Sequence, residues 1–218
     1  MKTIISPSIL GGSFSNMEKI ISELNMSKAE YIHFDVMDGD FVPNLTFGPQ
    51  FIFDLRLKTN KIFDVHLMIY RVSKYLDDYI KAGSDIITFH YEIDENINDI
   101  IERIKQEKIK VGIAIKPKTS WEKIKKYLHS VDQVIIMTVE PGFGGQSFLN
   151  DQVEKIKNIS HYIKKNNLKV DVEIDGGVNY DTGKLSIDAG ANVLVAGSFL
   201  FKKSNLIDAT NKLIDFFN

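Results

Sequence analysis

Two short segments of the chain each carry a histidine and an aspartate at alternating positions. They read His33-Phe34-Asp35 and Asp64-Val65-His66. Alternate side chains of a β-strand point to the same face, so two neighbouring strands of this kind would each present an imidazole and a carboxylate together. These ligands suit Zn2+, Fe2+ or Mn2+ better than Ca2+ or Mg2+. We therefore interpret His33, Asp35 and His66 as candidate metal ligands; the alternative is a hydrogen-bonded polar core.

A third aspartate, Asp175, stands at the end of an apolar run and directly before Gly176-Gly177. If that run is a strand distant from the one that carries Asp35, the two carboxylates approach a bound substrate from different sides. This arrangement suits removing a proton from one face of a carbon atom and returning a proton to the other face. The alternative is an aspartate that only forms a turn before glycine.

Three glycine-rich turns follow the last three apolar runs of the chain. Glycine allows backbone N–H groups to approach an anion closely, so these turns predict a phosphate site. None of them contains Lys or Arg, which leaves backbone dipoles and the hydroxyl and amide of Ser198 to hold the anion. The alternative is a set of tight turns with no ligand. The turns are Gly142-Phe143-Gly144-Gly145-Gln146-Ser147, Gly176-Gly177-Val178 and Gly197-Ser198.

Strand-like runs rich in Ile and Val alternate with segments of helical period along the whole chain. This alternation implies parallel strands, each covered by the helix that follows it. The expected strands are Thr3–Leu10, Tyr31–Met37, Ile62–Met68, Ile86–His90, Lys110–Ile115, Val131–Val139, Lys169–Ile174 and Val193–Ala196. The expected helices are Met17–Leu24, Pro49–Leu57, Val72–Lys81, Ile97–Gln106, Ser120–His129, Gln152–Lys165, Asp181–Ala189 and Asn205–Phe217.

Eight such units in 218 residues predict an α/β fold, a closed (β/α)8 TIM barrel that forms a single domain over residues 1–218. The candidate residues then lie near the carboxyl ends of the strands, where barrels carry out their chemistry. The alternative is an open doubly wound sheet. Its glycine-rich nucleotide loop follows the first strand, and Gly11-Gly12-Ser13 matches that fingerprint poorly.

Composition excludes several classes of protein. The net charge of -2 gives no electrostatic reason to expect a nucleic acid or a membrane surface as a partner. The absence of Cys excludes disulfides and thiolate metal sites and fits a cytoplasmic location. We expect no signal peptide and no membrane span. The Lys-rich helix within Glu154–Lys165 is interpreted as a solvated face, His129 and His161 as surface residues, and His90 at most as a support for a ligand.

Longer motifs resemble the ribulose-phosphate 3-epimerase family from Ser6 to Phe201. The resemblance implies a (β/α)8 barrel that interconverts D-ribulose 5-phosphate and D-xylulose 5-phosphate, a step of the pentose phosphate pathway, by proton transfer at C3 through a metal-stabilised ene-diolate. The motifs are Ser6-Pro7-Ser8-Ile9-Leu10, His33-x-Asp35-Val36-Met37-Asp38-Gly39-x-Phe41-Val42-Pro43-Asn44, Asp64-Val65-His66-Leu67-Met68, Met137-x-Val139-x-Pro141-Gly142-Phe143-Gly144-Gly145-Gln146, Asp175-Gly176-Gly177-Val178 and Gly197-Ser198.

The resemblance also implies roles for individual residues. It implies one divalent ion per subunit, Zn2+ or Fe2+ with Mn2+ or Co2+ as alternatives, held by His33, Asp35, His66 and Asp175. Asp35 and Asp175 would be the acid/base pair. The implied substrate contacts are Ser8, His66, Gly142, Phe143, Gly144, Gly145, Asp175, Gly176, Gly177, Gly197 and Ser198. Met37, Met68 and Met137 would line the pocket, although on sequence alone they are typical core residues.

The chain departs from the family at Gly11-Gly12-Ser13, where a change could alter access to the site, and at Ile115-Lys116-Pro117, where we expect no functional loss. The family implies a ketose phosphate as the small-molecule partner and a homo-oligomer of unspecified size. An epimerase of a related ketose phosphate, such as D-allulose 6-phosphate, is an alternative, and a non-catalytic sugar-phosphate sensor is another. A phosphate-binding barrel decarboxylase would need a Lys that Asp64-Val65-His66-Leu67-Met68 lacks.

Overall fold

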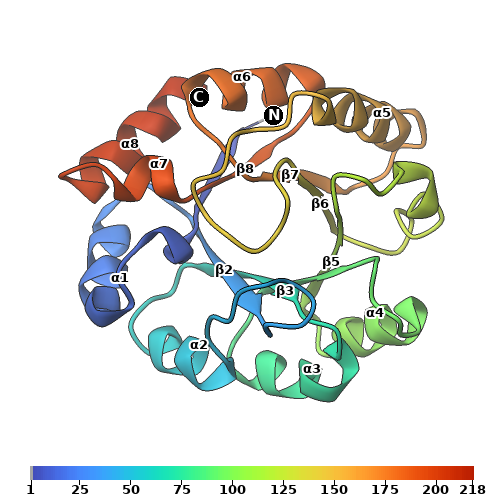
Figure 1. The fold of residues 1–218 in the computed structure, drawn as a ribbon, viewed down its shortest axis with the longest axis horizontal. Helices are drawn as coiled ribbons and strands as arrows, with labels where there is room; N and C mark the ends of the chain where they lie inside the picture. The colour runs from blue at the N-terminus through green and yellow to red at the C-terminus, as the bar shows by residue number, and fades with distance from the viewer. Residues whose placement is uncertain (1) are drawn as a thin grey trace.

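Eight parallel β-strands follow one another around a barrel in the computed structural model, which describes residues 2–218 (Figure 1). The hydrogen-bonded order is β1-β8-β7-β6-β5-β4-β3-β2, and a bridge between Ser8 and His33 joins the two ends of the series. The predicted (β/α)8 barrel is therefore confirmed. The strands are β1 (Ile4–Pro7), β2 (Tyr31–Met37), β3 (Ile62–Met68), β4 (Ile86–His90), β5 (Lys110–Ile115), β6 (Gln133–Met137), β7 (Asp171–Asp175) and β8 (Val193–Ala196).

Helices form a ring outside the strands and bury one apolar face against them (Figure 1). In α4, for example, four isoleucines at helical spacing are buried, and the Asn96 side chain caps the first turn by accepting from the Asn98 amide. The helices are α1 (Met17–Met26), α2 (Pro49–Arg56), α3 (Val72–Lys81), α4 (Ile97–Gln106), α5 (Gln152–Lys165), α6 (Tyr180–Ala189), α7 (Ser198–Phe201) and α8 (Leu206–Phe217). Among the described residues, no helix has the length and apolar character needed to cross a membrane.

The helix expected over Ser120–His129 is wrong. That segment begins with a short 3-10 helix, η3 (Trp121–Lys123), and continues as turns. Its amides bond to the carbonyl three residues back, as Ile124 does to Trp121 and Tyr127 does to Ile124. A three-residue repeat keeps the same apolar side chains on the barrel side, so an apolar pattern close to helical period is satisfied without an α-helix.

Several expected boundaries also differ from the structure. The first strand ends at Pro7 because Ile9–Gly11 forms a 3-10 turn, and the sixth strand is confined to Gln133–Met137. The seventh strand begins later than expected and includes Asp175 as its last residue, and the short helix α7 was not expected. Apart from α7, these differences fall at element ends, where loop contacts rather than periodicity decide the conformation.

Strand register brings the polar residues of β2 and β3 into facing pairs. His33 lies beside Asp64, and Asp35 lies beside His66. Phe34 alternates with these residues and is fully buried in the apolar core. The register therefore places two imidazoles and two carboxylates on the inner face of neighbouring strands.

Candidate active site

Four side chains converge near the carboxyl ends of β2, β3 and β7. The Oδ1 atom of Asp35 lies 3.4 Å from Nε2 of His33 and 3.7 Å from Nδ1 of His66. The Oδ2 atom of Asp175 lies 4.0 Å from the same His33 nitrogen and 3.5 Å from the same His66 nitrogen. An ion about 2.1 Å from four tetrahedral donors would separate those donors by about 3.4 Å. The spacing of the four groups therefore fits one divalent metal ion.

The two histidine nitrogens that face this cluster have no hydrogen-bond partner. His33 Nε2 and His66 Nδ1 have no hydrogen-bond partner, and both rings are fully buried. A buried polar atom without a partner is costly, so the arrangement calls for a group that the side chains themselves do not supply. A cation coordinated by both nitrogens and by the two carboxylates would satisfy all four residues, and His33, Asp35, His66 and Asp175 thus fit a metal ion.

Electrostatics favour positive charge in the cluster. Burial alone would lower the pKa of His33, but the carboxylates of Asp35 and Asp64 outweigh burial and raise that pKa well above its usual value. Burial opposes ionisation of Asp35, yet His33 and His66 hold the pKa of this carboxyl far below its usual range. A divalent cation would bring the positive charge that these groups otherwise obtain from protons.

A second polar layer lies beneath His33 inside the barrel. His33 Nδ1 is 2.8 Å from Oδ2 of Asp64, and Asp64 also accepts hydrogen bonds from Ser6 and Gln133. Burial, reinforced by the nearby Asp64 carboxylate, raises the pKa of Glu173 well above its usual value. The bond from Asp64 to His33 Nδ1 orients the imidazole ring so that His33 Nε2 points toward the cluster. Sequence reasoning gave Glu173 no role, although its alternation with Asp175 along β7 placed both on one face.

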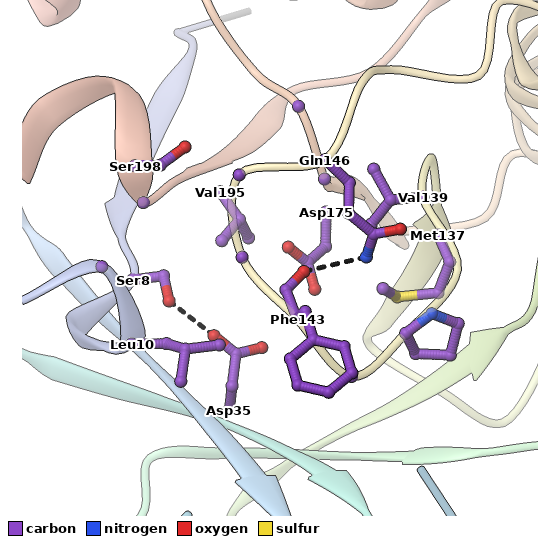
Figure 2. Close-up of a pocket in the computed structure, with 18 of the residues that line it drawn as sticks. Ser8, Leu10, Asp35, Met137, Val139, Phe143, Gln146, Asp175, Val195 and Ser198 are labelled. Carbon is purple, nitrogen blue, oxygen red and sulfur yellow. Dashed lines mark hydrogen bonds between the residues drawn. The ribbon is translucent and has the colours of Figure 1, made fainter. Parts of the chain in front are cut away.

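A cleft opens above the cluster at the mouth of the barrel (Figure 2). Its cavity volume is about 70 Å³, below the roughly 300–1,000 Å³ that is usual for small-molecule sites. Asp175 keeps 13% of its side chain exposed, and Asp35 accepts a hydrogen bond from the Ser8 hydroxyl. Both carboxylates line this cleft, so a ligand in the cleft would reach both of them.

The structure brings most of the predicted substrate contacts into the wall of this cleft. The three glycine-rich turns meet there, and among the described lining residues none is Lys or Arg. His66 does not line the cleft, because it is fully buried beneath it. His129 and His161 are exposed and lie outside the cleft. The predicted residues in the wall are Ser8, Met37, Met68, Met137, Gly142, Phe143, Gly144, Gly145, Asp175, Gly176, Gly177, Gly197 and Ser198.

The fold and the cluster define a (β/α)8 barrel with the features of an enzyme, in which paired acidic groups lie at the carboxyl ends of the strands. A model of the Ribulose-phosphate 3 epimerase family matches residues 4–201. The chain belongs to this family, as the sequence motifs predicted.

Relatives with this activity in their names cover most of the chain. A ribulose-phosphate 3-epimerase from Schizosaccharomyces pombe is 40% identical over 200 residues, which are 90% of this chain and 86% of the relative. One from Bacillus subtilis is 39% identical over 210 residues, which are 96% of this chain and 97% of the relative. A chloroplastic ribulose-5-phosphate-3-epimerase from Arabidopsis thaliana is 40% identical, over 94% of this chain and 74% of the relative.

Solved structures of other barrels share the fold. KGPDC from Streptococcus mutans superposes with a TM-score of 0.71 at 15% sequence identity, covering 100% of this chain and 98% of the other. Orotidine 5'-phosphate decarboxylase from Pyrococcus horikoshii superposes with a TM-score of 0.70 at 15% identity, covering 98% of this chain and 99% of the other. At this identity the likeness extends to the barrel architecture and no further.

Proposed function

We propose that this protein is a metal-dependent epimerase that interconverts D-ribulose 5-phosphate and D-xylulose 5-phosphate. One observation carries the proposal: Asp35 on β2 and Asp175 on β7 lie against one cleft, beside two imidazole nitrogens that have no partner in the protein. The family match and the names of the relatives support the same reaction.

Epimerisation at C3 requires a proton to leave one face of the carbon and a proton to arrive on the other. β2 and β7 are separated in the ring by β1 and β8, so their carboxylates approach the cleft from different sides. One aspartate accepts the C3 proton while the other, protonated, donates to the opposite face. The two exchange roles in the reverse direction.

The carbon acid next to a ketone is weak, so negative charge that develops on the substrate must be stabilised. A divalent cation held by His33, Asp35, His66 and Asp175 would supply that stabilisation as a Lewis acid. The donor set of two imidazoles and two carboxylates supports Zn2+ or Fe2+ as the native ion, with Mn2+ or Co2+ as alternatives.

The glycine turns are proposed to hold the phosphate group of the substrate. Gly145 and Ser198 approach each other across the cleft, since a Cβ atom built on Gly145 would lie 3.9 Å from Ser198 Cβ. With no Lys or Arg in the described wall, backbone amides and the Ser198 hydroxyl are the donors available to an anion. Binding the phosphate away from C3 would fix the orientation of the sugar between the two aspartates.

The proposal is tested by replacing each acidic residue with its amide. We expect Asp35→Asn and Asp175→Asn each to lower kcat for D-ribulose 5-phosphate by at least about a thousandfold, because general acid–base catalysis contributes about 10²–10⁴-fold and both residues also hold the ion. Asp188→Asn, on the outer surface of α6, is the matched control and should retain wild-type turnover. Circular dichroism and metal content are measured on the same samples. Near-full turnover by either cleft variant would rule out the two-aspartate scheme.

A single domain over residues 1–218 and a homo-oligomeric assembly are parts of the same proposal, and the cytoplasmic location also stays a prediction. Three strands of one eight-stranded sheet supply every residue of the metal cluster, which supports a site built within one barrel.

A further inference from the structure

A chain of two hydrogen bonds leads from His66 out to the loop after β4. His66 Nε2 lies 2.9 Å from Nε2 of His90, and His90 Nδ1 lies 3.0 Å from Oε2 of Glu92. We propose that His90 and Glu92 are positioning residues that decide which nitrogen of His66 carries its proton and so leave Nδ1 free for the cation. The inference rests on the proposed function, since it concerns the same metal cluster.

The hydrogen bonds of Glu92, at the outer end of this series, fix which atom donates in each of the two bonds. Glu92 Oε1 accepts from the backbone N–H of Lys116 at 2.8 Å and from the hydroxyl of Thr119. A backbone N–H can only donate, so this end of the carboxyl group is an acceptor. Burial opposes ionisation of Glu92, but hydrogen bonds from His90, Thr119 and Lys116 lower its pKa to about 2. The other oxygen of this ionised carboxylate can also only accept, so the facing His90 Nδ1 carries the hydrogen.

The proton positions on the two imidazoles then follow in turn. With its proton on Nδ1, neutral His90 offers a lone pair at Nε2. The facing nitrogen of His66 must then be the donor, because two lone pairs at 2.9 Å would repel. His66 consequently has its lone pair on Nδ1, which is the nitrogen that faces Asp35 and Asp175.

Packing holds the His90 ring in the orientation that the chain needs. The ring is fully buried, stacks on His66 with centroids 5.0 Å apart at 23°, and contacts Phe41 with centroids 4.8 Å apart. Lys116 in turn packs on Phe41, with its Nζ atom 3.7 Å from the Phe41 ring centroid. His90 therefore has no room to turn away from His66.

His33 is oriented in a simpler way. Its Nδ1 faces the carboxylate of Asp64, which can only accept when ionised, and its Nε2 faces the cluster. His66 instead depends on another imidazole, which can donate or accept. The proton arrangement at His66 can therefore be reversed by one substitution at the far end of the chain.

Glu92→Gln is that substitution. The amide oxygen keeps the bond from the Lys116 N–H, so the amide NH2 points at His90 Nδ1 and donates to it. The His90 proton then moves to Nε2, the facing nitrogen of His66 becomes the acceptor, and the His66 proton moves to Nδ1, where it blocks the cation. We expect the Kd for Zn2+ to rise by about 10- to 100-fold, the usual effect of losing such a support. Kd is measured by competition with a chromogenic chelator.

The second readout is the tautomer of His66, obtained from its 15N chemical shifts in the metal-free protein. Burial opposes protonation, but Asp175 and Asp35 raise the pKa of His66, so the shifts are measured at a pH high enough to leave the ring neutral. We expect the proton on Nε2 in the wild-type protein and on Nδ1 in Glu92→Gln. A residue that only supported the fold would not move this proton. Glu95→Gln is the matched control, because Glu95 lies in the same loop and bonds to the exposed Ser73 instead.

If Glu92→Gln folds poorly, a pair of variants at His90 provides an independent test. His90→Gln can present an amide oxygen to His66 and should retain most of the metal affinity, whereas His90→Leu cannot and should lose it. Wild-type Kd and an unchanged His66 tautomer in Glu92→Gln would overturn the inference. If the wild-type protein bound no Zn2+, the proposed metal site would fall, while the tautomer measurement would still support or overturn the role of His90 and Glu92.

Discussion

Backbone conformation at Gly177 shapes the floor of the cleft. Gly177 has φ +66, in the left-handed region that side chains rarely adopt. A Cβ atom built there would lie 2.7 Å from the backbone nitrogen of Phe148, which is too close for any real contact. Since Gly177 follows Asp175 by two positions, displacement here would disturb both the turn and the loop that faces it.

Gly177→Ala should therefore weaken both substrate binding and the fold. We expect KM for D-ribulose 5-phosphate to rise at least about tenfold, with a stability loss of about 1–3 kcal/mol from the strained conformation. Gly144→Ala is the control, because Gly144 lies in the same cleft wall and a Cβ there meets nothing within 4 Å. Steady-state kinetics and thermal unfolding of both variants give the comparison. Equal KM values for the two would contradict the proposed role of the Gly177 turn.

Single residues also show which parts of the site could be predicted from the sequence. The alternation of His33 with Asp35 was enough to predict inward-facing ligands, because a strand has a period of two. The support of His66 by His90 could not be derived in the same way, because it depends on the register and ring orientation of two different strands. Glu173 shows the same limit, since its contact with His33 crosses the barrel interior.

At the scale of elements, the loop between β6 and α5 folds over the mouth of the barrel (Figure 1). Two side-chain amides hold it. Gln146 donates to the carbonyl oxygens of Glu140 and Phe143 at 2.6 and 2.9 Å, and Figure 2 shows the bond to Phe143. Asn44, from the loop after β2, donates to the carbonyl oxygen of Gly142 at 2.8 Å. The loop is therefore shaped by bonds that it makes to itself and by one bond from a neighbouring loop.

Removing either amide should loosen this loop and reduce substrate affinity. We expect Gln146→Ala and Asn44→Ala each to raise KM by about threefold to tenfold, since each hydrogen bond contributes about 0.5–1.5 kcal/mol net. The double variant should cost less than the sum, because both amides hold one loop conformation. Gln50→Ala, on the outer helix α2, is the control. KM is measured together with hydrogen exchange of the loop amides, and fully additive effects with unchanged exchange would argue against a shared loop.

Whole elements were predicted well where apolar periodicity decides them. The strand Tyr31–Met37 and the helix Val72–Lys81 have the bounds that the sequence predicted. The segment Ser120–His129 was mispredicted because turns with a three-residue repeat and an α-helix bury nearly the same apolar positions. The loop over the mouth carries no periodicity, so its conformation depends on contacts from other parts of the barrel.

At the scale of the whole molecule, the ring of strands has its weakest backbone pairing beside the metal cluster, between β7 and β2, and we call this part of the ring the seam. β1 and β8 have 4 residues each, and within residues 2–218 the pairing between the ends of β1 and β2 is one bridge, from Ser8 to His33. The cluster lies across this seam, because Asp175 belongs to β7 and the other three residues belong to β2 and β3. A cation shared by these strands would tie together the parts of the ring that backbone hydrogen bonds connect least.

Removing the metal should therefore lower the stability of the entire barrel. A ligand at about 100 times its Kd that binds only the folded state adds about 2.7 kcal/mol, which for a chain of this size corresponds to a Tm shift of roughly 5 to 10 °C. We expect Tm, measured by circular dichroism, to fall by this amount after chelation and to recover when Zn2+ is added back. Asp175→Asn should lose most of the shift, because it removes the ligand on the far side of the seam, whereas Asp188→Asn should keep it. Since the bound ion ties β7 to β2, hydrogen exchange of the β1 and β8 amides should also slow when Zn2+ is added. A Tm that did not respond to Zn2+ in the wild-type protein would show that the cluster holds no ion of this kind.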